Sequence, residues 1–406
     1  MTRAWILVVL LGCSGPPPHP SSGFLAGAAA IDITPTREVP LGGYGARQGA
    51  LMTGVHDPIY AKALWLETPE ARICLVTTDL IGSTLEIRDA IKPADADLVL
   101  AASHNHSGPG ALARGVWVFA MGNYDPALRE ELVDKLRKVV ARARAGKRPA
   151  RLGFATIPVP ELSRNRRHEG GPTDPELSIL KVQDDLDQPM ALVINYAAHG
   201  TVLSDKNFQL SGDWPGAFQR ALEERLGGLA LYTNGAEGDI APRVPGGRDP
   251  FERCQAMGQA LAERVANLVG ALEKTTGGVR LGYVERGVVL PTPTLPLVPG
   301  KSVLGLLEIN GIRMFCFPGE PCVELGLELK RRFPGSWILG LANDHLGYFL
   351  TEAEYEKGGY ERSVSFYGPK MGPWLVRRFA ELGERGHAED RVGQPEGGGG
   401  KDDHRR

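Results

Sequence analysis

Apolar runs of five to twelve residues, each stopped by glycine, proline or a polar residue, recur along the chain and predict β-strands. They cover 28–35, 73–80, 97–102, 151–159, 177–182, 190–198, 229–233, 279–290, 303–309, 313–317 and 337–342. Four other segments carry apolar residues at helical spacing, namely 129–145, 214–226, 251–272 and 323–332. The pattern predicts an α/β protein in which mixed β-sheets are flanked by helices.

Several of these strands end in side chains that can bind metal or carry protons. These residues are Asp79, His104 with His106, His199, Glu320 and Tyr348. His104 and His106 follow strand 97–102 and precede Ser107-Gly108-Pro109-Gly110, so an extended backbone would point both imidazoles to one side. Ligands collect beyond strand ends in open sheets, so we expect these residues to meet at one edge.

Two imidazoles, a carboxylate and an open position form a catalytic zinc site, and a phenolate can complete the shell. His104, His199 and Glu320 fit this donor set. Each residue also has a plainer interpretation. The His-x-His pair can be a polar loop, His199 a hydrogen-bonded residue near the core, and Glu320 a solvated acid. If Glu320 is buried, however, it needs a charge partner, and a metal ion would be one.

Composition and charge narrow the class of protein. The chain has 406 residues, 42% apolar and 23% charged, with a formal net charge of −2, so no basic field points to nucleic acid.

The apolar run 4–11 followed by Gly12-Cys13 predicts an export signal within residues 1–13. It has the form of a bacterial lipobox that would lipidate Cys13. A plain signal peptide or a misassigned start codon are the alternatives.

The predicted layout places a linker at 14–25, one hydrolase domain at 26–384 and a polar, glycine-rich disordered tail at 385–406. We expect a protein anchored at the cell envelope, or otherwise periplasmic or secreted. Buried free thiols are the default for Cys74, Cys254, Cys316 and Cys322, although a Cys316–Cys322 bridge stays open.

An ordered set of motifs resembles the neutral/alkaline (non-lysosomal) ceramidases over roughly residues 28–374. The motifs are AAIDITP, TGVHDPIYAKALWLE, SHNHSGPG, an Asn-Arg pair followed by DPELSILKV, AAHGT, SGDWPG, NGAEGDIAPR, FPGEP and GYFLTEAEYEKGGYE. The resemblance implies a zinc amidohydrolase that cleaves the N-acyl bond of ceramide-like sphingolipids. It also implies His104, His199, Glu320 and Tyr348 as zinc ligands, with His106, Asp32 and Arg166 beside them or positioning substrate.

Two features depart from the family pattern. Ala241, in Gly238-Asp239-Ile240-Ala241, stands where the family carries a serine proposed as nucleophile. We also expect no C-terminal β-sandwich domain of the kind that family members usually carry, because the sequence stops soon after the matching motifs. We still expect the surrounding loop to line the substrate or its oxyanion. The residues concerned are Asn234, Gly235, Asp239 and Ala241.

Without the serine, the expected nucleophile is a zinc-activated water. His106 is the first candidate for the base and Asp32 the second, and Arg166 would stabilise oxyanion charge. Arg166 can instead be a solvated cation in a basic run. Two alternatives to ceramide hydrolysis remain open. One is a zinc hydrolase for another amide or ester, and the other is a non-catalytic cell-surface binding protein.

Overall fold

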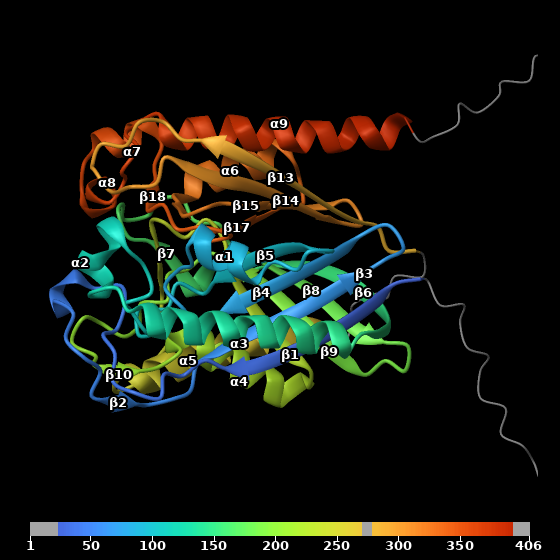
Figure 1. The fold of residues 1–406 in the computed structure, drawn as a ribbon, viewed down its shortest axis with the longest axis horizontal. Coiled ribbons are helices and arrows are strands. Elements are labelled where there is room, and N and C mark those ends of the chain that lie inside the picture. The colour runs from blue at the N-terminus through green and yellow to red at the C-terminus, as the bar shows by residue number, and fades with distance from the viewer. Residues whose placement is uncertain (1–22, 270–277, 393–406) are drawn as a thin grey trace, which may run out of the picture.

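The computed structural model describes residues 23–269 and 278–392 (Figure 1). Its larger sheet has the strand order β11-β9-β8-β6-β1-β3-β4-β5. The strands are β1 (Leu25–Asp32), β3 (Tyr60–Glu67), β4 (Arg72–Thr78), β5 (Asp97–Ala102), β6 (Arg148–Pro158), β8 (Glu176–Asp184), β9 (Pro189–Tyr196) and β11 (Leu229–Asn234). The β4–β5 and β9–β11 pairs are parallel and the other pairs are antiparallel, so the sheet is mixed as predicted.

The larger sheet divides at the junction of β1 and β6. Only the first residues of these strands pair there, Leu25 with Pro149 and Ala26 with Arg148. Leu75 of β4 and Val193 of β9 nevertheless belong to one buried core, so the two halves of the sheet share an interior. The segments that leave β5 and β9 run side by side and form a parallel bridge between Asn105 and Gly200. The exits of strands from opposite halves are thereby brought together.

A smaller sheet closes this interior from another side. It contains β13 (Leu281–Val289), β14 (Lys301–Ile309), β15 (Ile312–Cys316) and β17 (Trp337–Leu339), in that order. Leu307, Met314 and Trp337 point into the shared core. Because side chains alternate along a strand, Phe315 and Ile338 point to the opposite face, toward a helical layer.

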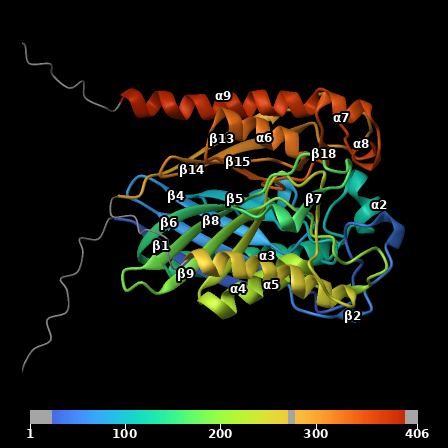
Figure 2. The same cartoon turned by 180° about the vertical axis from the view of Figure 1, so that it is seen from behind.

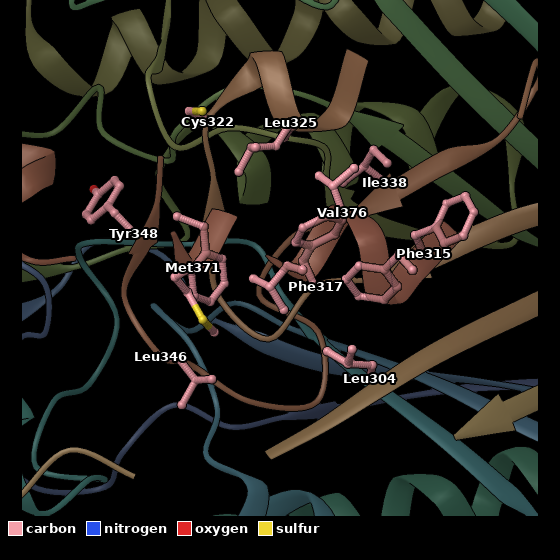
Figure 3. Packing of buried hydrophobic residues seen from close by; sticks show 14 of the residues in the cluster. Leu304, Phe315, Phe317, Cys322, Leu325, Ile338, Leu346, Tyr348, Met371 and Val376 are labelled. Atoms are coloured by element: carbon pink, nitrogen blue, oxygen red, sulfur yellow. The ribbon is translucent and has the colours of Figure 1, made fainter. Parts of the chain in front are cut away.

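Helices cover the outer faces of both sheets (Figures 1 and 2). The half of the larger sheet that contains β3, β4 and β5 packs on α3 (Pro126–Ala145). The half that contains β8, β9 and β11 packs on α4 (Asp213–Leu226) and α5 (Pro250–Val269). The smaller sheet packs on α6 (Val323–Arg332) and α9 (Met371–Val392). Figure 3 shows Phe315 and Phe317 of this last core beside Val376 of α9. Burying each aromatic ring contributes roughly 1.5–3 kcal/mol.

The remaining elements are short. They are β2 (Gly54–Val55), β7 (Ser163–Asn165), β10 (Gln209–Leu210), β12 (Ile240–Pro242), β16 (Glu320–Pro321), β18 (Tyr348–Phe349), α1 (Leu85–Ile91), α2 (Val118–Met121), α7 (Glu352–Glu356) and α8 (Tyr360–Ser363), with single 3-10 turns at Gly45–Arg47, Gly115–Trp117 and Pro160–Leu162. β16 pairs with β18, and β7 with β12. These pairings shape the candidate site.

The predicted helix 323–332 is confirmed with the same bounds, whereas α9 was not predicted. Residues 385–392, expected to be disordered, continue α9, and the rest of the predicted tail lies outside the described residues. The signal peptide, Cys13 and nearly all of the linker also lie outside them and stay predictions. The four remaining cysteines are free and buried, so the Cys316–Cys322 bridge is absent. Within the described ranges, no helix has the length and apolar content needed to cross a membrane.

Candidate active site

His104 stands just beyond β5 with its imidazole buried. Its φ of 58° lies in the left-handed region that residues other than glycine rarely adopt, and such strain is typical of functional sites. Nδ1 lies 2.8 Å from the carbonyl oxygen of Ile81. A carbonyl oxygen can only accept, so Nδ1 carries the proton and Nε2 of the neutral ring keeps a free lone pair.

His199 reaches the same place from β9 and is held in the same way. Its Nδ1 lies 3.1 Å from the carbonyl oxygen of Ile240, which therefore accepts the Nδ1 proton. The indole of Trp214 donates to the His199 carbonyl oxygen at 2.7 Å and fixes its backbone. Burial, together with the charge of Arg166, lowers the pKa of His199 to about 3. Its Nε2 is therefore an unprotonated acceptor.

Glu320 completes this cluster. Its Oε2 lies 3.0 Å from Nε2 of His104 and 3.2 Å from Nε2 of His199, and all three side chains are almost fully buried. None of the described residues makes a well-formed hydrogen bond to Oε2. Three acceptor atoms thus converge, and the protons of both imidazoles point away from the carboxylate. Such an arrangement fits a bound cation, because buried acceptors otherwise find donors.

Tyr348 is placed opposite Glu320 by the parallel pairing of β16 with β18. The backbone N–H of Glu320 also donates to the Gly347 carbonyl oxygen at 2.9 Å. The Tyr348 hydroxyl lies 3.1 Å from Nε2 of His199. Burial and the carboxylate of Glu320 raise the pKa of Tyr348 well above its usual range. The structure therefore gathers the four residues that the resemblance implied as ligands.

His106 lies on the other side of His104, with the two Nε2 atoms 3.1 Å apart. His104, His106 and His199 each offer a nitrogen within 4.8 Å of the others, so His106 is itself in reach of a cation at this place. Burial and the neighbouring imidazoles lower the pKa of His106 well below its usual value. Its Nδ1 is buried and has no hydrogen-bond partner in the described part of the chain. Nδ1 packs against Gly43, so Nε2 is the nitrogen of this neutral ring that faces the cluster and could serve as a general base.

Arg166 approaches from the segment after β7. Its Nη2 donates to the Tyr348 hydroxyl at 3.0 Å and to the Gly238 carbonyl oxygen at 2.9 Å, and its Nε donates to Glu361 at 2.9 Å. The carboxylate of Glu361 and the Tyr348 oxygen outweigh the effect of burial and raise the pKa of Arg166. Arg166 is thus an anchored cation at the cluster, and the solvated alternative is excluded.

The loop after β11 mainly braces the site. Asn234 donates to the Ser103 carbonyl oxygen at 2.9 Å, and Gly235 packs closely on Ala197. The Asp239 carboxylate accepts from the Val323 backbone N–H at 2.7 Å and from Asn165 at 2.9 Å. These contacts tie strand exits together. Ala241 is half-buried in β12, paired with Arg164 of β7.

Two acids are not brought to the cluster. Asp32 is exposed at the end of β1, and its carboxylate accepts the Thr34 N–H at 2.7 Å in a local turn. The prediction of Asp32 as second candidate for the base is therefore wrong, because β3 and β4 separate its strand from β5. Asp79 is buried but accepts from the Tyr60 N–H and from Gln219, so it braces the sheet edge.

Sequence reasoning missed His345. Its Nε2 lies 3.1 Å from Oε1 of Glu320, and its ring stacks on Trp117 at a centroid distance of 4.2 Å. The sequence offered one indication of its role, because His345 lies in the segment between β17 and Tyr348. Glu361 was also missed, because nothing local shows that α8 reaches Arg166.

A cavity of about 480 Å³ opens beside the cluster. His345 and Trp117 form part of its wall, together with the apolar side chains of Leu112 and Val298. Its volume lies in the range of small-molecule sites.

Comparison with known proteins shows what the chain is related to. Residues 24–279 match the model of the N-terminal region of neutral/alkaline non-lysosomal ceramidases. The chain belongs to this family. It is 26% identical to neutral ceramidase 1 of Arabidopsis thaliana over 59% of its own length, and 22% identical to the neutral ceramidase of Mycobacterium tuberculosis over 84%. The match spans 34% of the Arabidopsis protein and 74% of the mycobacterial one.

Family members of known structure share the fold. The crystal structure of the neutral ceramidase from Pseudomonas aeruginosa superimposes with a TM-score of 0.80 at 20% identity, covering 89% of this chain and 75% of that one. A structure described as ceramidase complexed with C2 superimposes with a TM-score of 0.81 at 19% identity. The α/β fold and the family resemblance expected from the motifs are both confirmed.

Proposed function

We propose that this protein is a zinc-dependent hydrolase that cleaves the amide bond of ceramide-like N-acyl lipids. One observation carries the proposal. The Nε2 lone pairs of His104 and His199 meet the Oε2 atom of Glu320 within 3.2 Å, and the protons of both imidazoles point away from it. Family membership supports the substrate class.

The donor set suits zinc. Zn²⁺ accepts imidazole nitrogens together with carboxylate and phenol oxygens, whereas an all-oxygen set would favour Mg²⁺ or Ca²⁺. His104, His199, Glu320 and Tyr348 would hold the ion, with His106 in reach. A zinc ion in such a site polarises a carbonyl group and acidifies water.

The protein's own residues supply proton transfer and charge stabilisation. His106 is neutral and turns Nε2 toward the cluster, so through Nε2 it can take a proton from the attacking water and return it to the leaving amine. Glu361 holds the guanidinium of Arg166, and Nη2 of Arg166 donates to the Tyr348 hydroxyl. Arg166 and the Tyr348 hydroxyl can therefore both stabilise negative charge on the carbonyl oxygen of the substrate. Because Ala241 offers no hydroxyl, the proposed nucleophile is water.

The cavity supports an amphiphilic substrate. Leu112, Trp117 and Val298 offer an apolar wall for a hydrocarbon chain. Its rim also carries the exposed charged residues Glu86, Arg114 and Lys301. This rim favours a second candidate function, hydrolysis of a shorter amide or ester whose other end is polar.

Metal analysis combined with hydrolysis of a fluorogenic N-acyl-sphingosine tests the proposal. We expect one zinc per chain in the wild type, and loss of both zinc and turnover in His199→Ala. His56→Ala is the matched control, because His56 is an exposed imidazole paired with Asp57. Zinc without ceramide turnover would favour the second candidate. Absence of any bound metal would contradict both.

A further inference from the structure

The two carboxylate oxygens of Glu320 have different surroundings. Oε2 faces the imidazoles of His104 and His199. Oε1 lies 3.1 Å from Nε2 of His345, whose side chain is also only 3% exposed. The same carboxylate is therefore shared between the candidate metal centre and a further histidine.

The structure indicates which nitrogen of His345 carries the proton. Its Nδ1 is buried against Gly82 and has no hydrogen-bond partner among the residues that the structure describes. Its Nε2 faces a carboxylate oxygen. A neutral imidazole places its hydrogen where an acceptor waits, so Nε2–H donates to Oε1 of Glu320.

The ring of His345 has little freedom to turn away. Trp117 stacks on it with an interplanar angle of 19°. The backbone N–H of His345 donates to Asp344 at 2.9 Å, and Asp344 in turn accepts from Ser302 at 2.7 Å. A Cβ at position 82 would overlap the ring, so glycine is needed there for the ring to fit. His345 is thus fixed before any ligand arrives.

We propose that His345 is a positioning residue that makes Glu320 present a single oxygen to the cation. By occupying Oε1, it keeps Glu320 from chelating through both oxygens, which would fill space that a catalytic site keeps for its reactants. Partners that hydrogen-bond a metal ligand in this way typically change metal affinity by about 10–100-fold when lost. The inference rests on the proposed metal-dependent function.

The test compares two replacements in the full-length protein. His345→Phe keeps an aromatic ring against Trp117 but removes the donor, whereas His345→Gln keeps a donor that can reach Oε1. Each variant is loaded with Co²⁺, whose visible absorption is strong at low coordination number and weak at high coordination number. Affinity for Zn²⁺ is measured by competition with a chromophoric chelator.

We expect His345→Phe to bind Zn²⁺ about 10–100-fold more weakly and to show weaker Co²⁺ absorption. His345→Gln should restore the wild-type spectrum, which a purely structural role of the ring does not predict. Gly82→Ala should change the spectrum in the same direction as His345→Phe, because its methyl group displaces the ring. Gly287→Ala, at a position with open space, is the control.

A folded His345→Phe variant with wild-type affinity and spectrum would overturn this inference alone. A wild type that binds Co²⁺ but leaves ceramide intact would revise the substrate, and the effect of His345 would still stand. A wild type that binds neither Co²⁺ nor Zn²⁺ would overturn the inference together with the proposed function.

Discussion

Two buried polar clusters lie next to each other in this protein and differ in how their charges are satisfied. The imidazole cluster consists of His104, His199 and Glu320. The arginine clasp consists of Arg167, Glu354 and Glu361. In the clasp, Arg167 donates to Glu354 at 2.8 Å and to Glu361 at 2.6 Å, and its remaining donors meet backbone carbonyl oxygens. Each charged group in the clasp thus faces an opposite one.

The imidazole cluster has no such complement. Its protons point outward to the carbonyl oxygens of Ile81 and Ile240, and its acceptor atoms point inward at one another. Buried polar groups therefore play two different roles in this protein. The clasp is complete within the chain and joins the segment after β7 to α7 and α8, whereas the imidazole cluster would be completed by the proposed zinc ion. Arg166 connects the two, through Glu361 on one side and Tyr348 on the other.

The largest expected effect comes from removing an imidazole of the cluster. His104→Ala should lower turnover by more than the roughly 100-fold typical of partners outside the metal shell, because it removes a ligand itself. In the wild type, zinc at a concentration 100 times its dissociation constant should add about 2.7 kcal/mol to the free energy of unfolding and so raise the thermal midpoint. In the variant, zinc should no longer raise the midpoint. Calorimetry with and without zinc measures this. An unchanged zinc-dependent shift in the variant would mean that the ion binds elsewhere.

Breaking the arginine clasp should lower stability but leave zinc binding intact. Arg167→Met leaves two buried carboxylates with fewer cations, so the free energy of unfolding should fall by about 3 kcal/mol. This lies at the low end for breaking a buried pair, because Lys357 and Arg166 still neutralise Glu354 and Glu361. Denaturant titration measures the loss, and zinc stoichiometry should stay at one. Loss of zinc in the folded variant would show that the two clusters are not separable.

Arg166 should show an intermediate effect. Arg166→Gln removes a charged donor from the Tyr348 hydroxyl but none of the cluster's acceptors, so turnover should fall by about 10²-fold with zinc retained. The measurement is kcat on the fluorogenic substrate together with metal content. If zinc were lost as well, Arg166 would act by holding the metal site together rather than by stabilising charge.

The smallest effect is expected at Ala241. Ala241→Ser restores the hydroxyl of the family pattern at a half-buried position, and stability should change by no more than about 0.5 kcal/mol. Turnover should stay close to that of the wild type, because the proposed mechanism uses water. A large rise in turnover would show that the hydroxyl takes part when it is present.

Much of the site was predictable because it lies at strand exits. His104, His199, Glu320 and Tyr348 each follow an apolar run that ends in glycine, proline or a turn, and the family motifs marked the same positions. Asp32 follows such a run too, but it is three strands away from His104 in the sheet order and stays exposed. Local pattern shows that a residue ends a strand, and strand order decides which ends meet.

His345, Arg167 and Glu361 could not be assigned from the sequence for a related reason. Their roles depend on partners far along the chain, with His345 bonded to Glu320 and Arg167 to Glu361. His345 lies three residues before Tyr348. Nothing in the sequence around it shows whether it would bind a metal itself or hold a residue that does.

The sequence by itself determined the α/β class, the bounds of helix α6, the family and the residue types available for chemistry, because these depend on local periodicity and on motif order. Only the tertiary structure decided that the larger sheet divides between β1 and β6, so that the exits of β5 and β9 lie side by side. It also decided which nitrogen of each histidine faces inward. Both follow from contacts between residues distant in sequence, and the hydrogen bonds to Ile81 and Ile240 turn two ordinary imidazoles into converging acceptors.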